Sequence, residues 1–397
     1  MPETIETGRP VTELSSRAKS VAAELAKHAL DTIAQRKLAK PSVALMRDAG
    51  LNRVLQPKRC GGIEGSLHDH IDVVEEVAYG CGSSGWCLGV YQAHSWLLGL
   101  FDQRAQDDAY DSDANALVSA VIGPRGQARK TKGGYMLSGF WPFCSGVHHA
   151  DWVLLGEMVT DDHGEIADSG VMLIPTRDVA IQDDWYVGGL TGTGSNSVVA
   201  KDLFVPAHRF LSFPAVIEGK APGVDLHKSA LYHSAAVPAL ALFICSAALG
   251  MSRRAYDAFV GRLPGRVVSY TFGEKQMDMV VTHLEVAEAA TKIDTARLLL
   301  HAMVDEVERY ATRGEQMPLT RRAKARMDCA YAVRLCLEAT QILYIATGGS
   351  GLAENSPIHL AQKDLHAVNM HGLLTMKTNL EMYGRILLGL QPNSPVI

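Results

Sequence analysis

The stretch that decides the fold is LVSAV at residues 117–121, with KGGY at 132–135 and WVLL at 152–155 following it along the chain. The first and the third are short apolar runs, and the second carries the paired glycines typical of a hairpin turn. Similar runs return at 171–174 (VMLI) and 197–199 (SVV), separated by Gly, Asp and Pro. Short strands at this spacing, without a long helical period between them, predict an antiparallel barrel or sandwich over residues 117–215.

A helical pattern precedes this β region, over residues 1–116. Apolar residues recur there at three- and four-residue spacing from residue 18 onward. The glycine cluster GCGSSG at 80–85 interrupts the pattern just before an apolar stretch. Because serine is a favoured helix N-cap, we expect Ser83 or Ser84 to cap the helix that follows.

Longer helical patterns follow the β region, over residues 216–397. Apolar residues mark one helix from about 279 to 310 and another around 330–342, and Pro318 and the glycines from Gly348 onward separate them. The expected fold class is therefore α+β and mostly α. It combines an N-terminal helical domain, a central antiparallel β domain and a C-terminal helical bundle.

The composition is that of an ordinary globular chain of 397 residues, 47% hydrophobic and 20% charged. A net charge of -5 without a block of like charge argues against a nucleic-acid partner. The seven cysteines include no CxxC pair, which disfavours a zinc site or a disulfide framework and predicts reduced thiols. Residues 1–10 do not resemble a signal peptide, and the most apolar run, 237–251, is short for a membrane span. We expect a cytoplasmic protein without a membrane partner.

The glycine-rich segment GGLTGTGS at 188–195 lacks the spacing of a dinucleotide-binding fingerprint and the Lys-Ser/Thr ending of a P-loop. It is either a tight loop between strands or a loop whose backbone and hydroxyl groups meet a ligand, with Thr191 and Thr193 as candidates. A second segment, SGFWPFCSG at 138–146, sets aromatic side chains beside a small hydroxyl. This combination suits a flat heteroaromatic cofactor, although an aromatic core strand would look the same.

Several histidines invite a catalytic or metal-binding interpretation. His148 and His149 are adjacent, and on a strand they would point to opposite faces, so we expect no metal site. His94 lies in an otherwise apolar helix, where a hydrogen-bonded core histidine and a catalyst are both possible. His366 and His371 differ by about 140° around a regular helix, so only one would face a given pocket unless the segment is a loop.

Five segments together resemble the acyl-CoA dehydrogenase superfamily and, within it, the two-component flavin-dependent aromatic monooxygenases. They are GCGSSGW at 80–86, SGFWPFCSG at 138–146, GLTGTGS at 189–195, KDLHA at 363–367 and YGRILLG at 383–389. The resemblance implies a C-terminal four-helix bundle that drives formation of a homotetramer. It also implies a flavin held between the β domain and the bundle, with help from a neighbouring subunit.

The resemblance also implies roles for single residues. Ser145 would bond the flavin, and Trp141 and Phe143 would form part of the wall around its ring. Thr191 and Thr193 would lie in the loop that approaches the flavin. The residues expected near its phosphate or ribityl chain, or near the cofactor of a neighbouring subunit, are Gly348, Gly349, Arg266 and Gln276.

The segment that carries the catalytic glutamate of an acyl-CoA dehydrogenase reads VNMHG at 368–372 here. In the resembling hydroxylases a histidine at this position serves the oxygen reaction, which implies that His371 is the acid/base. His94 would orient the substrate, and Ser119 matches another pocket position. The implied reaction uses O2 and reduced flavin, either FADH2 or FMNH2, supplied by a separate NAD(P)H-dependent flavin reductase. A C4a-hydroperoxyflavin would then hydroxylate a small aromatic substrate of the phenol or indole type.

Two other functions remain open at the level of sequence. An FAD-dependent acyl-CoA dehydrogenase or a related oxidase on the same fold would need a carboxylate base, for which Glu354 is the nearby candidate. A helical assembly protein without catalytic activity would bind no flavin. The sequence does not separate FMN from FAD, carbon from heteroatom oxidation, or a tetramer from a dimer.

Overall fold

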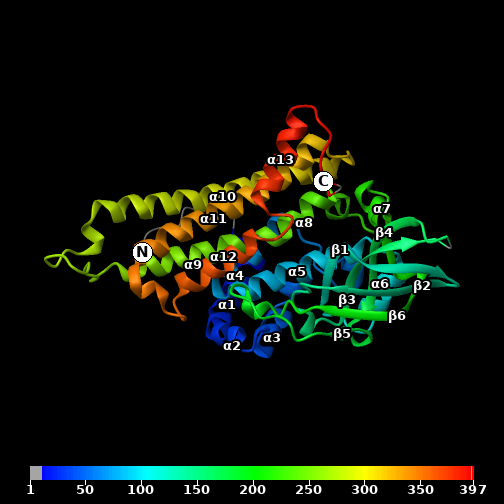
Figure 1. Ribbon diagram of the computed structural model, residues 1–397, viewed down its shortest axis with the longest axis horizontal. Coiled ribbons are helices and arrows are strands. Elements are labelled where there is room, and N and C mark those ends of the chain that lie inside the picture. Colours follow the sequence, from blue (N-terminus) through cyan, green and yellow to red (C-terminus); the bar gives the residue numbers. More distant parts are fainter. Residues whose placement is uncertain (1–10, 162, 395) are drawn as a thin grey trace.

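The computed structural model describes residues 11–161, 163–394 and 396–397. Helices come first along the chain, then strands, then helices again, and the strands gather at one end of an elongated molecule (Figure 1). The first helices are short to medium in length: α1 (Glu13–Lys27), α2 (Ala29–Ala34), α3 (Lys40–Asp48), α4 (Leu67–Gly80), α5 (Gly82–Gly99) and α6 (Gln103–Tyr110).

Helix α5 begins earlier than the sequence predicted. It starts at Gly82, so Ser83 and Ser84 lie inside the helix, and the expected serine cap was wrong. The cause is the close approach of α4 and α5, since a Cβ on Gly85 would lie 2.4 Å from the Cβ of Ala78. The glycine cluster thus lets two buried helices pack tightly at this point.

A seven-stranded sheet forms the middle of the chain, in the order β5-β6-β2-β1-β3-β4-β7. Its strands are β1 (Val118–Thr131), β2 (Gly134–Trp141), β3 (Trp152–Thr160), β4 (Ile166–Pro175), β5 (Ala180–Ile181), β6 (Val198–Pro206) and β7 (Phe210–Ser212). The predicted hairpin turn is confirmed between β1 and β2, where Gly133 has a φ of +84°.

The predicted barrel or sandwich is a single sheet with one parallel pair. β1 and β3 run parallel, and the other pairs are antiparallel. The chain leaves β2 through the short helix η3 (Val147–His149) and returns on the far side of β1, so β3 takes the direction of β1. This crossing places the loop after β2 next to helix α5.

The C-terminal helices begin beside the strands and include those that form the long arm of the molecule (Figure 1). They are α7 (Phe213–Ile217), α8 (Ala236–Cys245), α9 (Ala247–Arg262), α10 (Val280–Arg313), α11 (Leu319–Thr347), α12 (Pro357–Asn369) and α13 (Met376–Leu387). The two predicted long helices are confirmed as α10 and α11. Pro318 directly precedes α11, and Gly348, with a φ of +67°, directly follows it.

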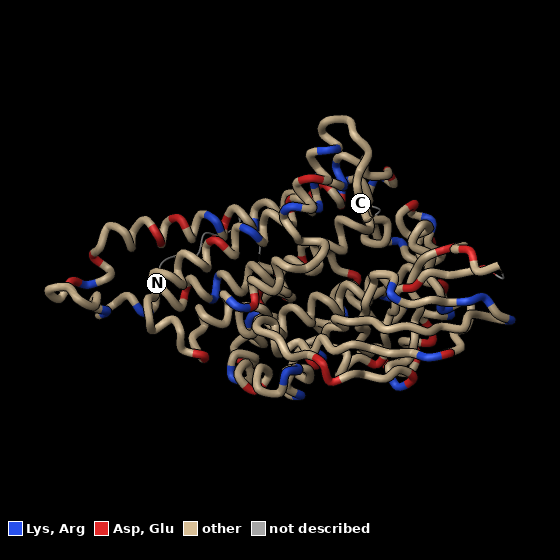
Figure 2. Tube along the Cα trace, in the orientation of Figure 1, with Lys and Arg blue, Asp and Glu red and all other residues tan. Residues whose placement is uncertain are grey.

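One continuous core joins the first and last helices, and it includes Val74, Leu88, Phe243, Leu300 and Cys336. All seven cysteines are buried and unpaired, as expected of reduced thiols. Acidic and basic residues are interspersed along the helices and strands (Figure 2).

Two helical stretches, 236–262 and 319–352, are long and apolar enough to span a membrane by length and composition. The first is longer than the run of 237–251 seen in the sequence. Within their most apolar windows, 83% and 56% of the residues are buried inside the fold, which accounts for much of that composition.

Candidate active site

A chain of hydroxyl groups connects the loop after β2 to helix α5. Trp86 Nε1 donates to Ser145 Oγ at 3.0 Å, and Ser145 Oγ lies 2.8 Å from Ser195 Oγ. Ser195 Oγ lies 2.6 Å from Thr193 Oγ1, which donates to the carbonyl of Leu190 at 2.8 Å. An indole N–H can only donate, a carbonyl can only accept, and each hydroxyl has one hydrogen. All four hydrogen bonds therefore point from the indole towards the carbonyl.

The backbone around Ser145 is held by two buried hydroxyl groups. Ser119 on β1 has no exposed surface, and its Oγ donates to the carbonyl of Ser145 at 2.7 Å. The Tyr91 hydroxyl on α5 donates to the carbonyl of Gly146 at 2.8 Å. Gly146 has a φ of +74°, and a Cβ there would lie 2.3 Å from that hydroxyl oxygen. Ser119 therefore affects this site indirectly, by holding the backbone of Ser145 in place.

His371 lies in the loop between α12 and α13, so its direction is not set by the helix that carries His366. Its ring centroid is 5.9 Å from that of Trp86. The backbone N–H of Leu373 donates to His371 Nδ1 at 3.3 Å, so the neutral imidazole carries its hydrogen on Nε2. Burial, and to a lesser degree the charge of Arg326, lowers the pKa of His371 to about 4. At neutral pH this side chain is an uncharged donor through Nε2.

His94 on α5 has the opposite tautomer. Its Nδ1 lies 3.1 Å from the carbonyl of Val118, so Nδ1 carries the hydrogen and Nε2 keeps its lone pair. Burial lowers the pKa of His94 to about 4, which keeps the ring neutral. His366 is exposed, and among the described residues its hydrogen-bond partner is Gln362 on its own helix, at 2.9 Å, so it takes no part in this cluster.

The two aromatic residues expected around the flavin lie in different surroundings. Phe143 is 68% exposed and has a φ of +68°, which is unusual for an aromatic residue. Its ring centroid is 6.1 Å from that of Trp185, edge to face. Trp141 has no exposed surface, and its Nε1 donates to the carbonyl of Gly156 at 2.6 Å. Phe143 therefore offers an open aromatic face, whereas Trp141 packs in the core of the β domain.

The glycine-rich loop is fastened to helix α12. Asp364 accepts a 2.7 Å hydrogen bond from the backbone N–H of Leu190, and a Cβ on Gly189 would lie 2.2 Å from the carbonyl of Lys363. Burial raises the pKa of Asp364 to about 6. Thr193 follows in the short helix η5 (Thr191–Thr193) and belongs to the hydroxyl chain, whereas the Thr191 hydroxyl donates to the carbonyl of Val187 at 3.2 Å. The KDLHA segment thus positions the loop through Asp364.

His148 and His149 lie in η3 and not on a strand, so the reason given for rejecting a metal site was wrong. Each ring has a protein partner: His148 Nε2 lies 2.9 Å from Asn196 Oδ1, and His149 Nε2 lies 2.8 Å from the carbonyl of Leu38. Among the described residues, no group of three or more His, Cys, Asp or Glu side chains has a metal-binding arrangement.

The remaining predicted flavin contacts form a second cluster at the other end of the molecule. Arg266 donates to the carbonyl of Thr347 at 2.7 Å and to Ser350 Oγ at 3.3 Å. Gln276, in the short helix η9 (Gln276–Asp278), donates to the carbonyl of Ala346 at 2.8 Å. These contacts gather around η10 (Gly348–Leu352), which contains Gly348 and Gly349. The cluster lies at the far end of the long arm, away from the strands (Figure 1).

Four residues at these two clusters were not predicted from the sequence. Trp86 and Ser195 extend the hydroxyl chain, and Asp364 holds the glycine-rich loop. Arg262 also donates to the carbonyl of Thr347, at 3.1 Å, in the second cluster. Three of the four lie inside segments that were already recognised, but only their contacts reveal what each one does.

Glu354, the carboxylate that a dehydrogenase would need, is exposed and lies before the first residue of α12. His371 lies beyond the last residue of the same helix, which has 13 residues. At 1.5 Å per residue this helix separates the two by about 20 Å. Glu354 therefore cannot replace His371 in the cluster.

Family models for two domains match the chain: "Acyl-CoA dehydrogenase, N-terminal domain" over residues 14–110 and "Acyl-CoA dehydrogenase, C-terminal domain" over residues 242–376. The chain belongs to the acyl-CoA dehydrogenase superfamily. It is 34% identical over 360 residues to the flavin-dependent monooxygenase oxygenase subunit HsaA of Rhodococcus jostii, covering 91% of this chain and 94% of the relative.

Further relatives place the chain within one branch of this superfamily. It is 31% identical to the oxygenase component of the FADH2-dependent resorcinol hydroxylase of a Rhizobium species, covering 97% and 96% of the two chains. The structure of XiaF from a Streptomyces species, in complex with FADH2 and glycerol, superposes with a TM-score of 0.92 at 27% identity, covering 97% of each chain. The chain is therefore an enzyme of the flavin-dependent monooxygenase branch, and the expected family and fold are confirmed.

The residues around Ser145, namely Trp86, Ser195, Phe143 and His371, form the first cluster, and they suit a flavin. A flavin is flat, has an apolar edge and a polar edge, and needs an aromatic face together with hydrogen-bonding groups. Phe143 supplies an exposed ring, and Ser145 supplies a hydroxyl whose neighbours hold it in one orientation. The first cluster is therefore the candidate active site.

Proposed function

We propose that the protein is the oxygenase component of a two-component system that hydroxylates a small aromatic compound of the phenol or indole type. Reduced flavin, once bound, activates O2 for transfer of one oxygen atom. The observation that carries this proposal is the cluster of Ser145, Trp86 and His371, in which Trp86 bonds an aligned hydroxyl and lies next to a neutral imidazole. Relatives that are oxygenase components, such as that of the resorcinol hydroxylase, support a separate flavin reductase as the partner.

The direction of the hydroxyl chain favours the reduced form of the cofactor. Ser145 donates its hydrogen to Ser195 and accepts one from Trp86, so its remaining capacity is as an acceptor. The central ring nitrogen of a reduced flavin carries hydrogen and can donate, whereas that of an oxidised flavin can only accept. Ser145 in this orientation therefore complements reduced flavin, with Phe143 beside the ring system.

The two neutral histidines have complementary roles towards a substrate. His94 has its lone pair on Nε2 and can accept a hydrogen bond from a phenol O–H or an indole N–H. His371 has its hydrogen on Nε2 and can donate a hydrogen bond to oxygen, which would stabilise negative charge that develops there. Because burial keeps both rings uncharged near pH 7, neither needs a counter-ion in the site.

The second cluster supports a homo-oligomer, which we propose to be a homotetramer. Arg266 and Gln276 belong to the segment that joins α9 to α10, at the end of the long arm opposite the strands (Figure 1), whereas Ser145 follows strand β2. They are placed to reach the phosphate or ribityl chain of a flavin in a neighbouring subunit. Exposed apolar residues surround this end of the arm, namely Val267, Tyr270, Phe272, Met277, Val280, Val281 and Leu284. Their burial between subunits would stabilise the assembly.

A dehydrogenase acting on a thioester is the alternative, and the position of Glu354 argues against it. The test is to mix the protein anaerobically with reduced flavin, add oxygen, and follow the flavin absorbance and the hydroxylation of a phenol and of indole. His371→Ala should bind reduced flavin but hydroxylate about 100- to 1,000-fold more slowly, the usual range for a lost hydrogen-bond donor to developing negative charge. His366→Ala is the matched control. Failure to bind reduced flavin, or reduction of bound FAD by an acyl-CoA, would contradict the proposal.

A further inference from the structure

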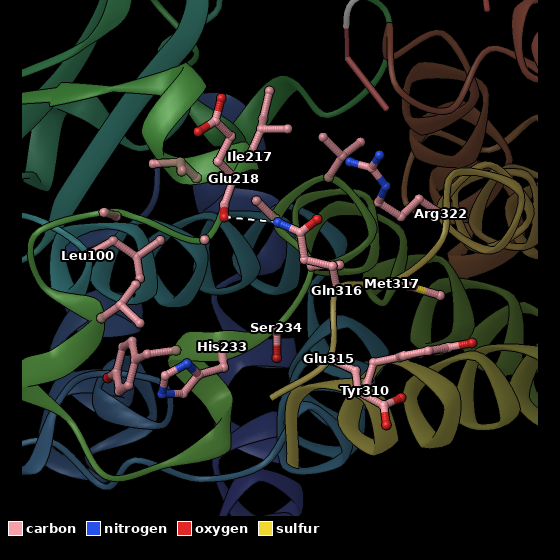
Figure 3. A pocket seen from close by; sticks show the side chains of 18 of the residues that line it. Leu100, Ile217, Glu218, His233, Ser234, Tyr310, Glu315, Gln316, Met317 and Arg322 are labelled. Atoms are coloured by element: carbon pink, nitrogen blue, oxygen red, sulfur yellow. Dashed lines mark hydrogen bonds between the residues drawn. The ribbon is translucent and has the colours of Figure 1, made fainter. Parts of the chain in front are cut away.

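The segment between β5 and η5, residues 182–190, carries Trp185, whose ring packs against that of Phe143. The two ring centroids are 6.1 Å apart and the ring planes meet at 87°, so the rings form a corner, called here the aromatic corner. Phe143 is exposed and Trp185 is partly exposed, so both rings keep free surface. Neither ring lines the cavity of about 240 Å³ between α7 and the segment that joins α10 to α11 (Figure 3). The aromatic corner is therefore a separate feature of the surface.

The indole of Trp185 is tied to the hydroxyl chain of the candidate active site. Its Nε1 donates to the carbonyl of Leu190 at 3.3 Å, and the Thr193 hydroxyl donates to the same oxygen at 2.8 Å. A carbonyl oxygen has two lone pairs, so it can accept both hydrogen bonds. The Leu190 carbonyl thus fixes both the indole of Trp185 and the end of the hydroxyl chain that orients Ser145.

Arg36, in the connection between α2 and α3, holds the main chain of this segment. Its guanidinium donates to the carbonyl of Trp185 at 3.2 Å and to the hydroxyl of Tyr186 at 3.1 Å, and it pairs with Asp183 at 3.1 Å. The central carbon of the same group lies 3.7 Å from the centroid of the Tyr186 ring. A partly exposed ion pair adds little to stability, whereas several contacts made by one rigid planar group fix the position of the segment.

The backbone around the aromatic corner is strained at three points. Six non-glycine residues in the described part of the chain have a positive φ, and three of them meet here: Arg36 at +53°, Phe143 at +68° and Leu190 at +50°. Each of the three contacts Trp185, through the guanidinium, the ring and the carbonyl respectively. Strained residues of this kind persist where many contacts hold them, and they cluster at ligand-binding and active sites. Together with the exposed rings, the strain indicates that a ligand binds at the aromatic corner.

We propose that Trp185 contacts the flavin as a second aromatic residue, and that Arg36 is the positioning residue that holds Trp185 in place. This inference rests on the proposed function. Because the planes of Phe143 and Trp185 are nearly perpendicular, a flat ring system stacked on one ring would meet the other edge to face. Both arrangements are favourable between aromatic rings. Loss of the Arg36 side chain would release the main chain of Trp185 and with it the aromatic corner.

The test is anaerobic equilibrium dialysis of the full chain against reduced FMN and reduced FAD. The variants are Trp185→Ala, Arg36→Met and the double variant that combines them. The matched control is Arg177→Met, because Arg177, in the short helix η4 (Thr176–Asp178), is exposed and pairs with Asp178 at 3.9 Å, outside the aromatic corner.

Trp185→Ala should weaken the binding of reduced flavin about 3- to 10-fold, the effect of losing one aromatic contact. Arg36→Met should weaken it by a similar factor. The double variant should bind no more weakly than Trp185→Ala, because a residue that acts through another has no further effect once its target is removed. The control variant should keep the affinity of the unaltered protein.

Tryptophan emission gives a readout that a purely structural role of Trp185 would not change. The part of the emission that Trp185→Phe lacks should be quenched when reduced flavin binds to the unaltered protein, because the indole then lies against the flavin. This measurement remains decisive even if Trp185→Ala or Arg36→Met does not fold.

The proposal is overturned if the emission of Trp185 is not quenched, or if Trp185→Ala or Arg36→Met binds reduced flavin like the unaltered protein. It is also overturned if the two losses add in the double variant, since Arg36 would then act elsewhere. These outcomes differ from failure of the proposed function, in which the unaltered protein itself would not bind reduced flavin.

Discussion

Acid should destabilise this protein through histidines that the fold keeps uncharged. His70 and His94 are buried on α4 and α5, and burial lowers the pKa of each from 6.5 to about 4. In the unfolded chain each ring takes up a proton near pH 6.5, whereas in the folded chain it does so only near pH 4. The unfolded state therefore binds more protons in this window. The free energy of unfolding is at its full value above about pH 6.5 and falls as the pH is lowered towards 4.

The size of the effect follows from the two pKa values of each histidine. When folding lowers a histidine pKa from 6.5 to about 4, the free energy of unfolding falls by about 3.4 kcal/mol once the pH is well below 4, at 1.36 kcal/mol for each pH unit. Between pH 7 and pH 5 the same values give a loss of about 1.8 kcal/mol for each histidine. Removal of one of the two should therefore change the pH dependence of stability by a measurable amount.

The assay is urea unfolding of the unaltered protein and of His70→Gln at pH 7 and pH 5. His70 is the better choice because it pairs with Gln92 in the core, at 2.6 Å, and has no proposed role in the reaction. Between pH 7 and pH 5, the free energy of unfolding of the variant should fall by about 1.8 kcal/mol less than that of the unaltered protein. This difference does not depend on the stability of the variant at pH 7. His366→Gln removes an exposed histidine and should keep the original dependence. Equal losses in His70→Gln and the unaltered protein would refute the reasoning.

Other predictions concern the core and the two flavin clusters. Glu75→Gln should cost about 1.5–3 kcal/mol in urea unfolding, because Arg297, at 2.5 Å, and Arg253, at 2.8 Å, lose their shared carboxylate, although each keeps a second one, Asp294 and Glu76 respectively. Glu24→Gln, on the exposed face of α1, should have little effect. Phe143→Ala should weaken binding of reduced flavin about 5- to 10-fold in equilibrium dialysis, because a stacked ring contributes about 1–1.5 kcal/mol, and an unchanged affinity would remove Phe143 from the site. Arg266→Gln should weaken flavin binding by about 10-fold or more without altering the isolated fold, and normal binding would exclude the proposed contribution from a neighbouring subunit.

Much of the architecture is readable in the sequence because it depends on local periodicity. Apolar residues three and four apart predicted α10 and α11, and the paired glycines at 133 and 134 predicted the hairpin between β1 and β2. The early start of α5 was missed because it depends on the contact between Gly85 and Ala78, two residues on different helices. The parallel pairing of β1 with β3 was missed for a similar reason, since a crossing connection leaves no periodic signal.

By itself, the sequence determined the order of helices and strands and the superfamily, and it predicted His371 as the residue in place of a dehydrogenase glutamate. These properties depend on residue type and spacing along the chain. Only the tertiary structure decided that His371 lies beside Trp86, that the remaining hydrogen-bonding capacity of Ser145 is as an acceptor, and that the segment joining α9 to α10, which carries Arg266, lies at the opposite end from the strands. Hydrogen-bond direction and burial depend on neighbours brought from distant parts of the chain, and spacing along the sequence does not record those neighbours.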